Sequence, residues 1–148
     1  MPVEVKGARE LALYIHSLSE RLDPAMRSAT ILAGGALRDH MRRNADTGQH
    51  QKGHRRTGGG PGPNRVTGHL HDSILYTQPF GSRGAYSTTV GPSARYGRWV
   101  EEGHAIRRAG RTVGQCPAYP YVRPAGAQFL AKDLPEISRQ VLTQIAGG

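Results

Sequence analysis

Seven histidines are the first residues in this sequence whose chemistry could define a site. His50 and His54 lie four residues apart, and His69 and His71 lie two apart with Asp72 adjacent. First-row metals accept imidazole and carboxylate ligands, but no H-E-x-x-H or paired C-x-x-C motif accompanies these residues. The spacing favours histidines on polar surfaces, and a metal-dependent nuclease using His69, His71 and Asp72 is kept as the third of three hypotheses.

Other residues with catalytic potential are also poorly arranged for chemistry. The glycine-rich run at 58–62 has no Gly-Lys-Ser/Thr ending, so it is not a P-loop. Glu101 and Glu102 are adjacent and fall on different sides of a helix, where bridging to a neighbouring arginine is the expected role. The single Cys116 excludes an intrachain disulfide and reads as a small packing residue. We therefore expect no enzyme, no cofactor and no metal.

The charge of the chain is strongly basic, with 20 Lys+Arg against 11 Asp+Glu, a formal net charge of +9 and a pI near 10.4. Two acid-poor runs carry the basic partner-contact candidates, namely Lys52, Arg55, Arg56, Arg107, Arg108 and Arg111. Such runs suit DNA phosphates or acidic faces of neighbouring subunits, and their alternative interpretation is a solvated surface. Because no aromatic residue interleaves with them, any contact with DNA is expected to lack sequence preference.

Helical periodicity dominates the first third of the chain. Leu11, Ile15, Leu18 and Leu22 predict an amphipathic helix over about 7–22. Asp23 and Pro24 can cap and start a second helix, which runs to about Asn44. Its predicted buried stripe is Met26, Thr30, Ala33, Leu37 and Met41. The Gly34–Gly35 pair within it indicates close approach of another backbone.

The remaining elements predict a small antiparallel sheet and a closing helix. Strands are expected at about 74–80 and 85–91 around a turn at 81–84, with a third strand at 119–123 beside them. The last helix should begin near Pro124, with Pro135 kinking it. Its residues expected to face inward are Phe129, Leu130, Leu134, Ile137, Val141 and Ile145. The fold class is α+β: N-terminal helices, a small antiparallel sheet and a C-terminal helix across one face, with long basic loops.

Two glycine-containing basic segments complete the predicted organisation of a single 1–148 domain. Residues 45–66 hold eight Gly or Pro and one acid, Asp46, and are expected to form a flexible arm that becomes ordered against another chain. Residues 104–116 are expected to form a second basic loop. No apolar run approaches the ~20 residues of a membrane span, and no signal peptide is recognised, so a cytoplasmic product without membrane contact is expected.

Two motifs rich in aromatic residues lie on either side of the second basic segment. Tyr96, Trp99, Val100 and Gly103 share one face of a short helix, and Trp99 is expected to be buried against the sheet or a neighbouring subunit. Residues 117–125 read PAYPYVRPA and combine prolines with Tyr121. The core or subunit-interface candidates are Tyr96, Trp99, Val100, Glu101, Glu102 and Tyr121.

Three segments in order, TGHLHDSI at 67–74, VGPSARYGRWVEEG at 90–103 and PYVRPA at 120–125, resemble the gene-product-ten-like tail-component family of long-tailed phages. The resemblance covers about residues 64–146 well and the first 45 in general character. Trp99 departs from it, because a smaller or tyrosyl residue is usual there, and the segment before Thr67 is longer and more basic than is usual.

The resemblance implies a structural neck or tail-completion protein of the virion, assembled in the bacterial cytoplasm. Its subunits would form a ring of six or twelve copies at the head–tail junction, with six preferred. The implied partners are the head-tail connector or stopper and the tail terminator, with nonspecific contact to genome DNA. The alternative from the charge is a small basic DNA-binding protein unrelated to virions.

Overall fold

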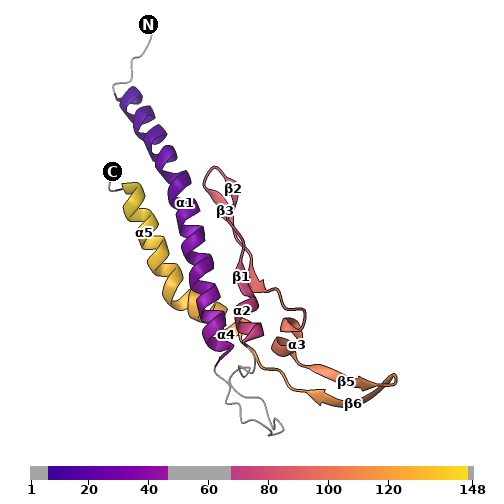
Figure 1. Cartoon of the computed structure of the whole chain (residues 1–148). Helices are drawn as coiled ribbons and strands as arrows, with labels where there is room; N and C mark the ends of the chain where they lie inside the picture. The colour runs from indigo at the N-terminus through magenta and orange to yellow at the C-terminus, as the bar shows by residue number, and fades with distance from the viewer. Residues whose placement is uncertain (1–6, 47–67, 147–148) are drawn as a thin grey trace.

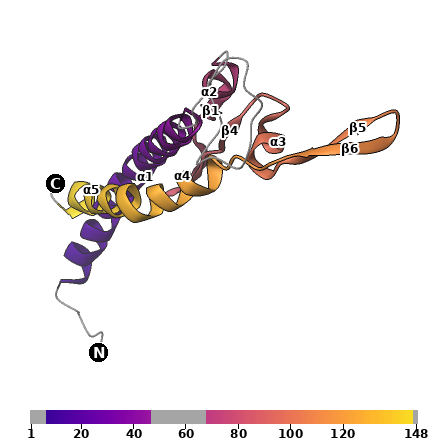
Figure 2. The same ribbon diagram turned by 90° about the horizontal axis from the view of Figure 1, so that it is seen from below.

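A long helix, α1 (Ala8–Asn44), is the central element of the computed structural model, which describes residues 7–46 and 68–146. The C-terminal helices pack along one side of α1, and a narrow β-ribbon packs along the other (Figure 1). A second β-hairpin projects away from this body (Figures 1 and 2). The α+β class, with a long N-terminal helix, small antiparallel sheets and a C-terminal helix, is confirmed.

The first helix is continuous, so the prediction of two helices separated at Asp23–Pro24 was wrong. Pro24 lies inside α1, where it removes one ladder hydrogen bond at a cost of about 3 kcal/mol. Packing of α5 and β3 against α1 offsets that loss. Asp23 is also engaged elsewhere, since its carboxylate accepts hydrogen bonds from the Gly84 N–H and the Tyr86 hydroxyl, both at 2.8 Å.

These contacts of Asp23 join α1 to the tip of the β-ribbon. The hydrogen bond from the Gly84 N–H, followed by that from Tyr86, holds the pKa of Asp23 below its ordinary value. The same hydrogen bond to Asp23 raises the pKa of Tyr86. The hydrogen bond between Asp23 and Tyr86 therefore needs an ionised carboxylate and a protonated phenol. It is retained at pH values between the lowered pKa of Asp23 and the raised pKa of Tyr86.

The β-ribbon is one interrupted hairpin, as the two predicted strands anticipated. It follows a short helix, α2 (His69–Ser73), and pairs β1 (Ile74–Tyr76) with β4 (Val90–Pro92) and β2 (Phe80–Ser82) with β3 (Ala85–Ser87). Between the two ladders, the Thr77 N–H donates to Thr89 O (2.9 Å) and the Thr88 hydroxyl donates to Thr77 O (2.7 Å). These hydrogen bonds join the two sides of the hairpin between its two ladders.

A paired glycine site shows how closely the ribbon lies on α1. A Cβ on Gly34 would come within 2.9 Å of Tyr76 Cδ2 and 3.2 Å of Thr88 Cγ2, whereas one on Gly35 would meet nothing within 4 Å. The close approach predicted at this pair is therefore real at Gly34, but it is made by side chains of the ribbon and not by a backbone. The guanidinium of Arg38 lies 5.3 Å from the centre of the Tyr76 ring beside it.

The C-terminal region is helical from Val122, so the strand predicted at 119–123 was wrong. Helix α4 (Val122–Gln128) leads through a π-helical turn (Phe129–Asp133) into α5 (Leu134–Ala146). The π-helical turn ends at Asp133, two residues before Pro135. In a regular α-helix the pyrrolidine ring of Pro135 would clash with the backbone carbonyl four residues earlier. Leu130 and Leu134 are exposed, contrary to the inward placement expected for them.

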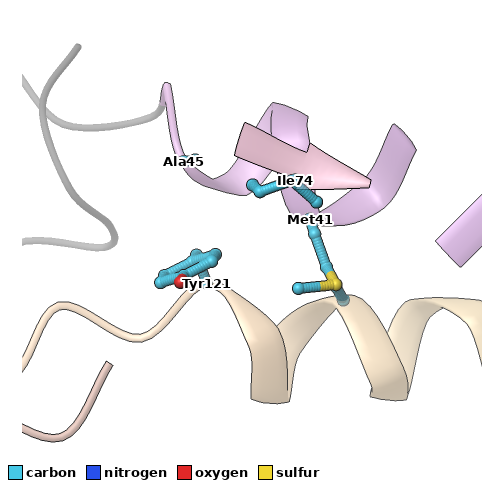
Figure 3. Packing of buried hydrophobic residues seen from close by; sticks show 5 residues of the cluster. Met41, Ala45, Ile74 and Tyr121 are labelled. Carbon is cyan, nitrogen blue, oxygen red and sulfur yellow. The ribbon is translucent and has the colours of Figure 1, made fainter. Parts of the chain in front are cut away.

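The hydrophobic core lies at the C-terminal end of α1 and consists of Met41, Ala45, Ile74, Tyr121 and Ala125 (Figure 3). Partly buried side chains surround it, namely Leu37, Leu70, Val90, Val100 and Val122. Ala45 was expected to begin the flexible arm, yet only 3% of it is exposed. The rest of that predicted arm, 47–66, lies outside the described residues.

The basic segment 104–116 forms strands, so the loop predicted there was wrong. Strands β5 (His104–Arg108) and β6 (Arg111–Cys116) pair around Ala109 and Gly110, whose positive φ angles of 47° and 78° fit a tight hairpin turn. Residues 104–115 are all exposed. Within the described ranges, no helix has the length and apolar character needed to cross a membrane.

The adjacent glycines of α1 give a matched test of this packing. Gly35→Ala should raise the free energy of unfolding by up to about 1 kcal/mol, because alanine favours the helix and its methyl group has room. Gly34→Ala should lower it, because Tyr76 and Thr88 must shift. Urea unfolding of both variants measures the difference, and equal stabilisation by both would contradict the close contact between α1 and the ribbon.

Candidate functional site

The two aromatic motifs meet at a junction formed by a helix cap. Glu101, in the short helix α3 (Gly97–Glu102), accepts hydrogen bonds from the backbone N–H groups of Tyr121 (2.7 Å), Val122 (2.9 Å) and Arg123 (3.1 Å). These groups belong to the start of α4, where backbone donors have no partner within the helix. A carboxylate also interacts favourably with the positive end of the helix dipole. Glu101 is therefore the cap of α4.

Tyr121 closes the same junction from the other side. Its side chain is fully buried, and its hydroxyl donates to the Gly97 carbonyl at 3.2 Å. The Tyr119 N–H donates to Val100 O at 2.8 Å. Burial, together with the nearby charge of Glu101, raises the pKa of Tyr121 to about 12. The phenol consequently stays protonated and keeps its bond to α3 at neutral pH.

Two glycines allow this close packing. A Cβ on Gly97 would lie 2.5 Å from Pro92 Cγ and 2.9 Å from the Tyr121 hydroxyl oxygen. Gly103 has a φ of 73°, and a Cβ there would lie 2.7 Å from Cys116 O. Both positions therefore require glycine: one for contact with Tyr121, and one where the chain leaves α3 for β5.

Trp99 lies outside the junction, and its predicted burial against the sheet was wrong. Its side chain is 57% exposed, and its ring centre lies 5.7 Å from that of His104. Gly97, Val100 and Glu101 form the inward side of α3, and Trp99 falls on the opposite side of this helix. Because Gly97 has no side chain and Glu101 is charged, Val100 is the only one of these three residues that a pattern of hydrophobic residues could identify.

The other members of the predicted interface set are divided between the two sides of α3. Val100 packs against the core, whereas Tyr96 is exposed at 5.9 Å from the His69 ring. Glu102 forms the predicted bridge to an arginine, with Arg98 at 2.9 Å. Glu101 forms the cap instead, a role for which the sequence offered no local signal because its partners are 20 or more residues away.

Three of the six basic partner-contact candidates lie in the projecting β5–β6 hairpin. Arg107, Arg108 and Arg111 are exposed, and Arg108 is the cross-strand partner of Arg111 beside the turn. Across residues 7–46 and 68–146, no carboxylate forms an ion pair with these three arginines. Like charges placed opposite each other destabilise a hairpin slightly, so an acidic partner would relieve the repulsion. Lys52, Arg55 and Arg56 lie outside the described residues.

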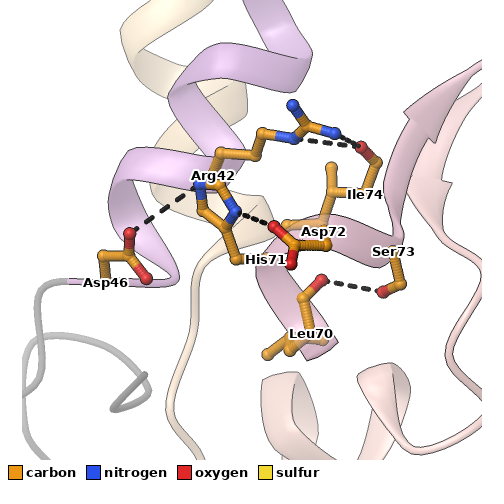
Figure 4. Close-up of polar contacts among 7 residues, drawn as sticks. All are labelled: Arg42, Asp46, Leu70, His71, Asp72, Ser73 and Ile74. Carbon is orange, nitrogen blue, oxygen red and sulfur yellow. Dashed lines mark hydrogen bonds and ion pairs between the residues drawn. The ribbon is translucent and has the colours of Figure 1, made fainter. Parts of the chain in front are cut away.

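His71 of α2 contacts two carboxylates near the C-terminal end of α1. His71 Nδ1 lies 2.8 Å from Asp72 Oδ1, and its Nε2 lies 3.8 Å from Asp46 Oδ2 (Figure 4). Arg42 donates two hydrogen bonds to the Ile74 carbonyl beside them. His50 and His54 lie outside the described residues. Among the residues that are described, no group of three or more His, Cys, Asp or Glu side chains is arranged so that it could hold a metal ion.

A polar cluster that the sequence analysis missed connects α1 to the C-terminal helices. His40 is buried, and its Nε2 lies 2.7 Å from Asp133 Oδ2 in the π-helical turn. Arg43 lies 2.9 Å from the other ring nitrogen, and Asn44 donates to the Tyr121 carbonyl at 3.2 Å. The helical spacing of His40, Arg43 and Asn44 was the available signal, but their partners come from distant parts of the chain.

Comparison with known proteins gave one family match. The family model described as "Bacteriophage HK97-gp10, putative tail-component" matches residues 9–103. The match begins in α1, includes the β-ribbon and ends at Gly103, so it contains Gly97 and Glu101 but not Tyr121. Neither the curated proteins nor the solved structures gave a match.

Removal of the cap tests the junction directly. Glu101→Ala should lower the free energy of unfolding by about 2 kcal/mol, because three backbone donors lose a charged acceptor. Glu102→Ala is the matched control and should change it by less than about 0.5 kcal/mol, since it removes only an exposed ion pair. Chemical denaturation of both variants makes the comparison, and equal losses would contradict the capping role.

The raised pKa of Tyr121 predicts a pH dependence of stability. The unfolded chain releases the phenolic proton near pH 10 and the folded chain only near pH 12, so this contribution is complete below pH 10 and is lost between these values. Tyr121→Phe should therefore show a smaller loss of stability over that range than the wild type. Tyr14→Phe, at an exposed position, should retain the wild-type profile. Identical profiles for all three proteins would contradict the burial of the Tyr121 hydroxyl.

Proposed function

The chain belongs to the HK97-gp10-like family of bacteriophage tail components, and from this premise we propose that it is a neck or tail-completion protein. In this role it forms a ring at the head–tail junction, with six copies preferred, and joins the head connector or stopper to the tail terminator. The observation that carries the proposal is the family match over residues 9–103. Its work is structural, and no catalytic step is assigned to it.

The projecting hairpin supports a role in contact with other proteins. The β5–β6 hairpin starts directly after Gly103 and returns to the chain just before Tyr119, so both of its ends are attached at the capped junction. Its residues 104–115 are exposed, and they include the apolar Ile106 and Val113 as well as the three arginines. A rigid base with an exposed arm suits insertion into a groove on a neighbouring protein. The exposed Trp99 lies beside His104 at the base of the hairpin and would extend the contact surface.

Acidic protein faces are the proposed partners of the arginines. A ring through which the genome passes must let a polyanion slide, so tight phosphate binding at its lumen would obstruct DNA ejection. Phosphate contacts would also make binding to duplex DNA weaken steeply with salt, with a log–log slope of about 0.9 per contact. We therefore expect weak binding to duplex DNA and a main role for these residues in assembly.

Charge reversal of the hairpin tests this role. The triple variant Arg107→Glu, Arg108→Glu, Arg111→Glu should keep the wild-type melting temperature, because the residues are exposed, and should reduce the yield of tailed particles at least tenfold. A control triple at the exposed Arg27, Arg83 and Arg95 changes the charge equally and should retain the yield. Wild-type yield from the hairpin variant, combined with loss of tight duplex binding, would favour DNA as the partner.

A further inference from the structure

Helix α1 carries an apolar seam with the spacing of a helix-pairing surface. The α1 seam consists of residues separated alternately by four and three positions, namely Leu11, Ile15, Leu18, Leu22, Ala25, Ala29 and Leu32. Apolar residues at this spacing lie in one line along a helix and typically pack against a second helix. The seam begins near the first turn of α1 and extends over more than half of that helix.

The C-terminal part of the seam already has a helical partner within the chain. Ala25, Ala29 and Leu32 line one small hollow together with Ile137 and Val141 of α5. Ala25 is buried there, whereas Leu32 at the edge of the contact between α1 and α5 is 52% exposed. The Arg21 guanidinium donates to the Ile145 carbonyl at 3.4 Å, next to the end of α5 at Ala146. Coverage by α5 therefore ends near Arg21, and this packing shows which kind of element fits the seam.

The N-terminal part of the seam continues the same line without a cover in the described chain. Leu11 and Ile15 are more than half exposed. Leu22 is less exposed and marks the end of this uncovered part, because Gly84 of the β-ribbon lies close to its side chain. Figures 1 and 2 show α1 extending beyond the end of α5 on this side of the molecule. An apolar helix laid along Leu11, Ile15 and Leu18 would repeat the packing that α5 makes further along.

A matching apolar surface lies on α5 itself. The α5 stripe consists of Leu134 and Leu142, both exposed, with Leu142 at 67%. Leu130, in the π-helical turn before α5, is exposed as well. Leu134 precedes Val141 by two helical turns and lies at the edge of the side that Ile137 and Val141 turn to α1. Leu142 directly follows Val141 and points about a quarter turn away from that side. Each copy therefore presents an uncovered seam and an uncovered helical stripe at different places.

Charge also favours pairing of these two surfaces. Residues 8–22 of α1 carry Arg9 and Arg21 against Glu10 and Glu20, two positive and two negative charges that sum to zero. Helix α5 carries Arg139 against Glu136, which also sum to zero. The whole chain carries +9, and contact between two helical segments of zero net charge adds no like-charge repulsion of its own. Neutral helices also offer nothing to a nucleic acid.

We propose that the α5 stripe of one copy packs on the N-terminal part of the α1 seam of the next copy. The two surfaces differ, so the contact is heterologous, and repeated contacts of this kind close into a ring when their rotation permits. The inference rests on the proposed ring and identifies the surfaces that build it. In the ring, α5 contacts α1 of its own chain on one side and α1 of a neighbour on the other.

Crosslinking of mixed single-cysteine chains tests the pairing. In a Cys116→Ser background, Ile15→Cys protein is mixed with Leu142→Cys protein and treated with a short bismaleimide crosslinker, both as purified protein and in assembled particles. A covalent dimer is expected from the mixture and not from either chain alone. Leu13→Cys replaces Ile15→Cys in the control, because Leu13 is as exposed as Ile15 (61% against 57%) but lies on the opposite side of α1. Dimers from Ile15→Cys alone, equal linking through Leu13→Cys, or no link in either preparation would overturn the pairing.

Glutamate substitutions provide a second measurement without a crosslinker. Ile15→Glu and Leu142→Glu should each weaken self-association roughly 30-fold or more, as expected for a residue at the centre of an interface. Leu13→Glu should leave self-association unchanged, and wild-type association by Ile15→Glu would overturn the inference. The proposed function is tested separately by the position of the protein in the particle. A ring at the head–tail junction in which these crosslinks do not form would contradict only the proposed pairing of α5 with α1. Crosslinked rings found elsewhere in the particle would contradict only the proposed function.

Discussion

The Glu101 carboxylate at the start of α4 is the interaction on which the rest of the structure depends. It joins a six-residue helix, too short to be stable alone, to the backbone that leads into the C-terminal helices. Tyr121 completes the connection by entering the core beside Met41 and Ile74. Both ends of the β5–β6 hairpin leave from this junction, so one capped helix sets the direction in which the exposed arm projects.

The distribution of apolar residues is uneven in a way that suits an assembled particle. Buried side chains gather at the C-terminal end of α1, where Met41, Ala45, Ile74, Tyr121 and Ala125 pack together. Towards the other end of the subunit, leucines of α1 and α5 are exposed. A monomer gains nothing from these exposed residues, whereas a ring of copies can bury them. The structure therefore separates a region that folds the subunit from regions available to neighbours.

Sequence reasoning predicted the elements that depend on local pattern. The helix from Met26 to Met41 and the hairpin were predicted from spacing and turn residues, and the family from its resemblance in three motifs. Of the predicted buried stripe, Met41 is fully buried and the other four residues are partly buried, and the hairpin is interrupted where two continuous strands were expected. Sequence reasoning failed where distant contacts decided the outcome. Pro24 continues a helix because α5 and β3 pack across it, and residues 119–121 lack a strand because they wrap around α3. Trp99 was predicted to be buried against the sheet or a neighbouring subunit because of its size, but within the subunit it is exposed, and Gly97, Val100 and Glu101 face inward from α3. The cap formed by Glu101 joins residues 20 positions apart and has no local signature.

The position and copy number of the protein in the phage particle test the central claim most directly. Cryo-electron microscopy of purified tailed particles, with the protein located by fitting its long α1 helix, would give both quantities in one measurement. The account predicts a single ring of six copies between the head connector and the tail, with the β5–β6 hairpins inserted into the adjoining proteins. Copies repeated along the length of the tail, or a particle in which the protein is absent, would contradict it.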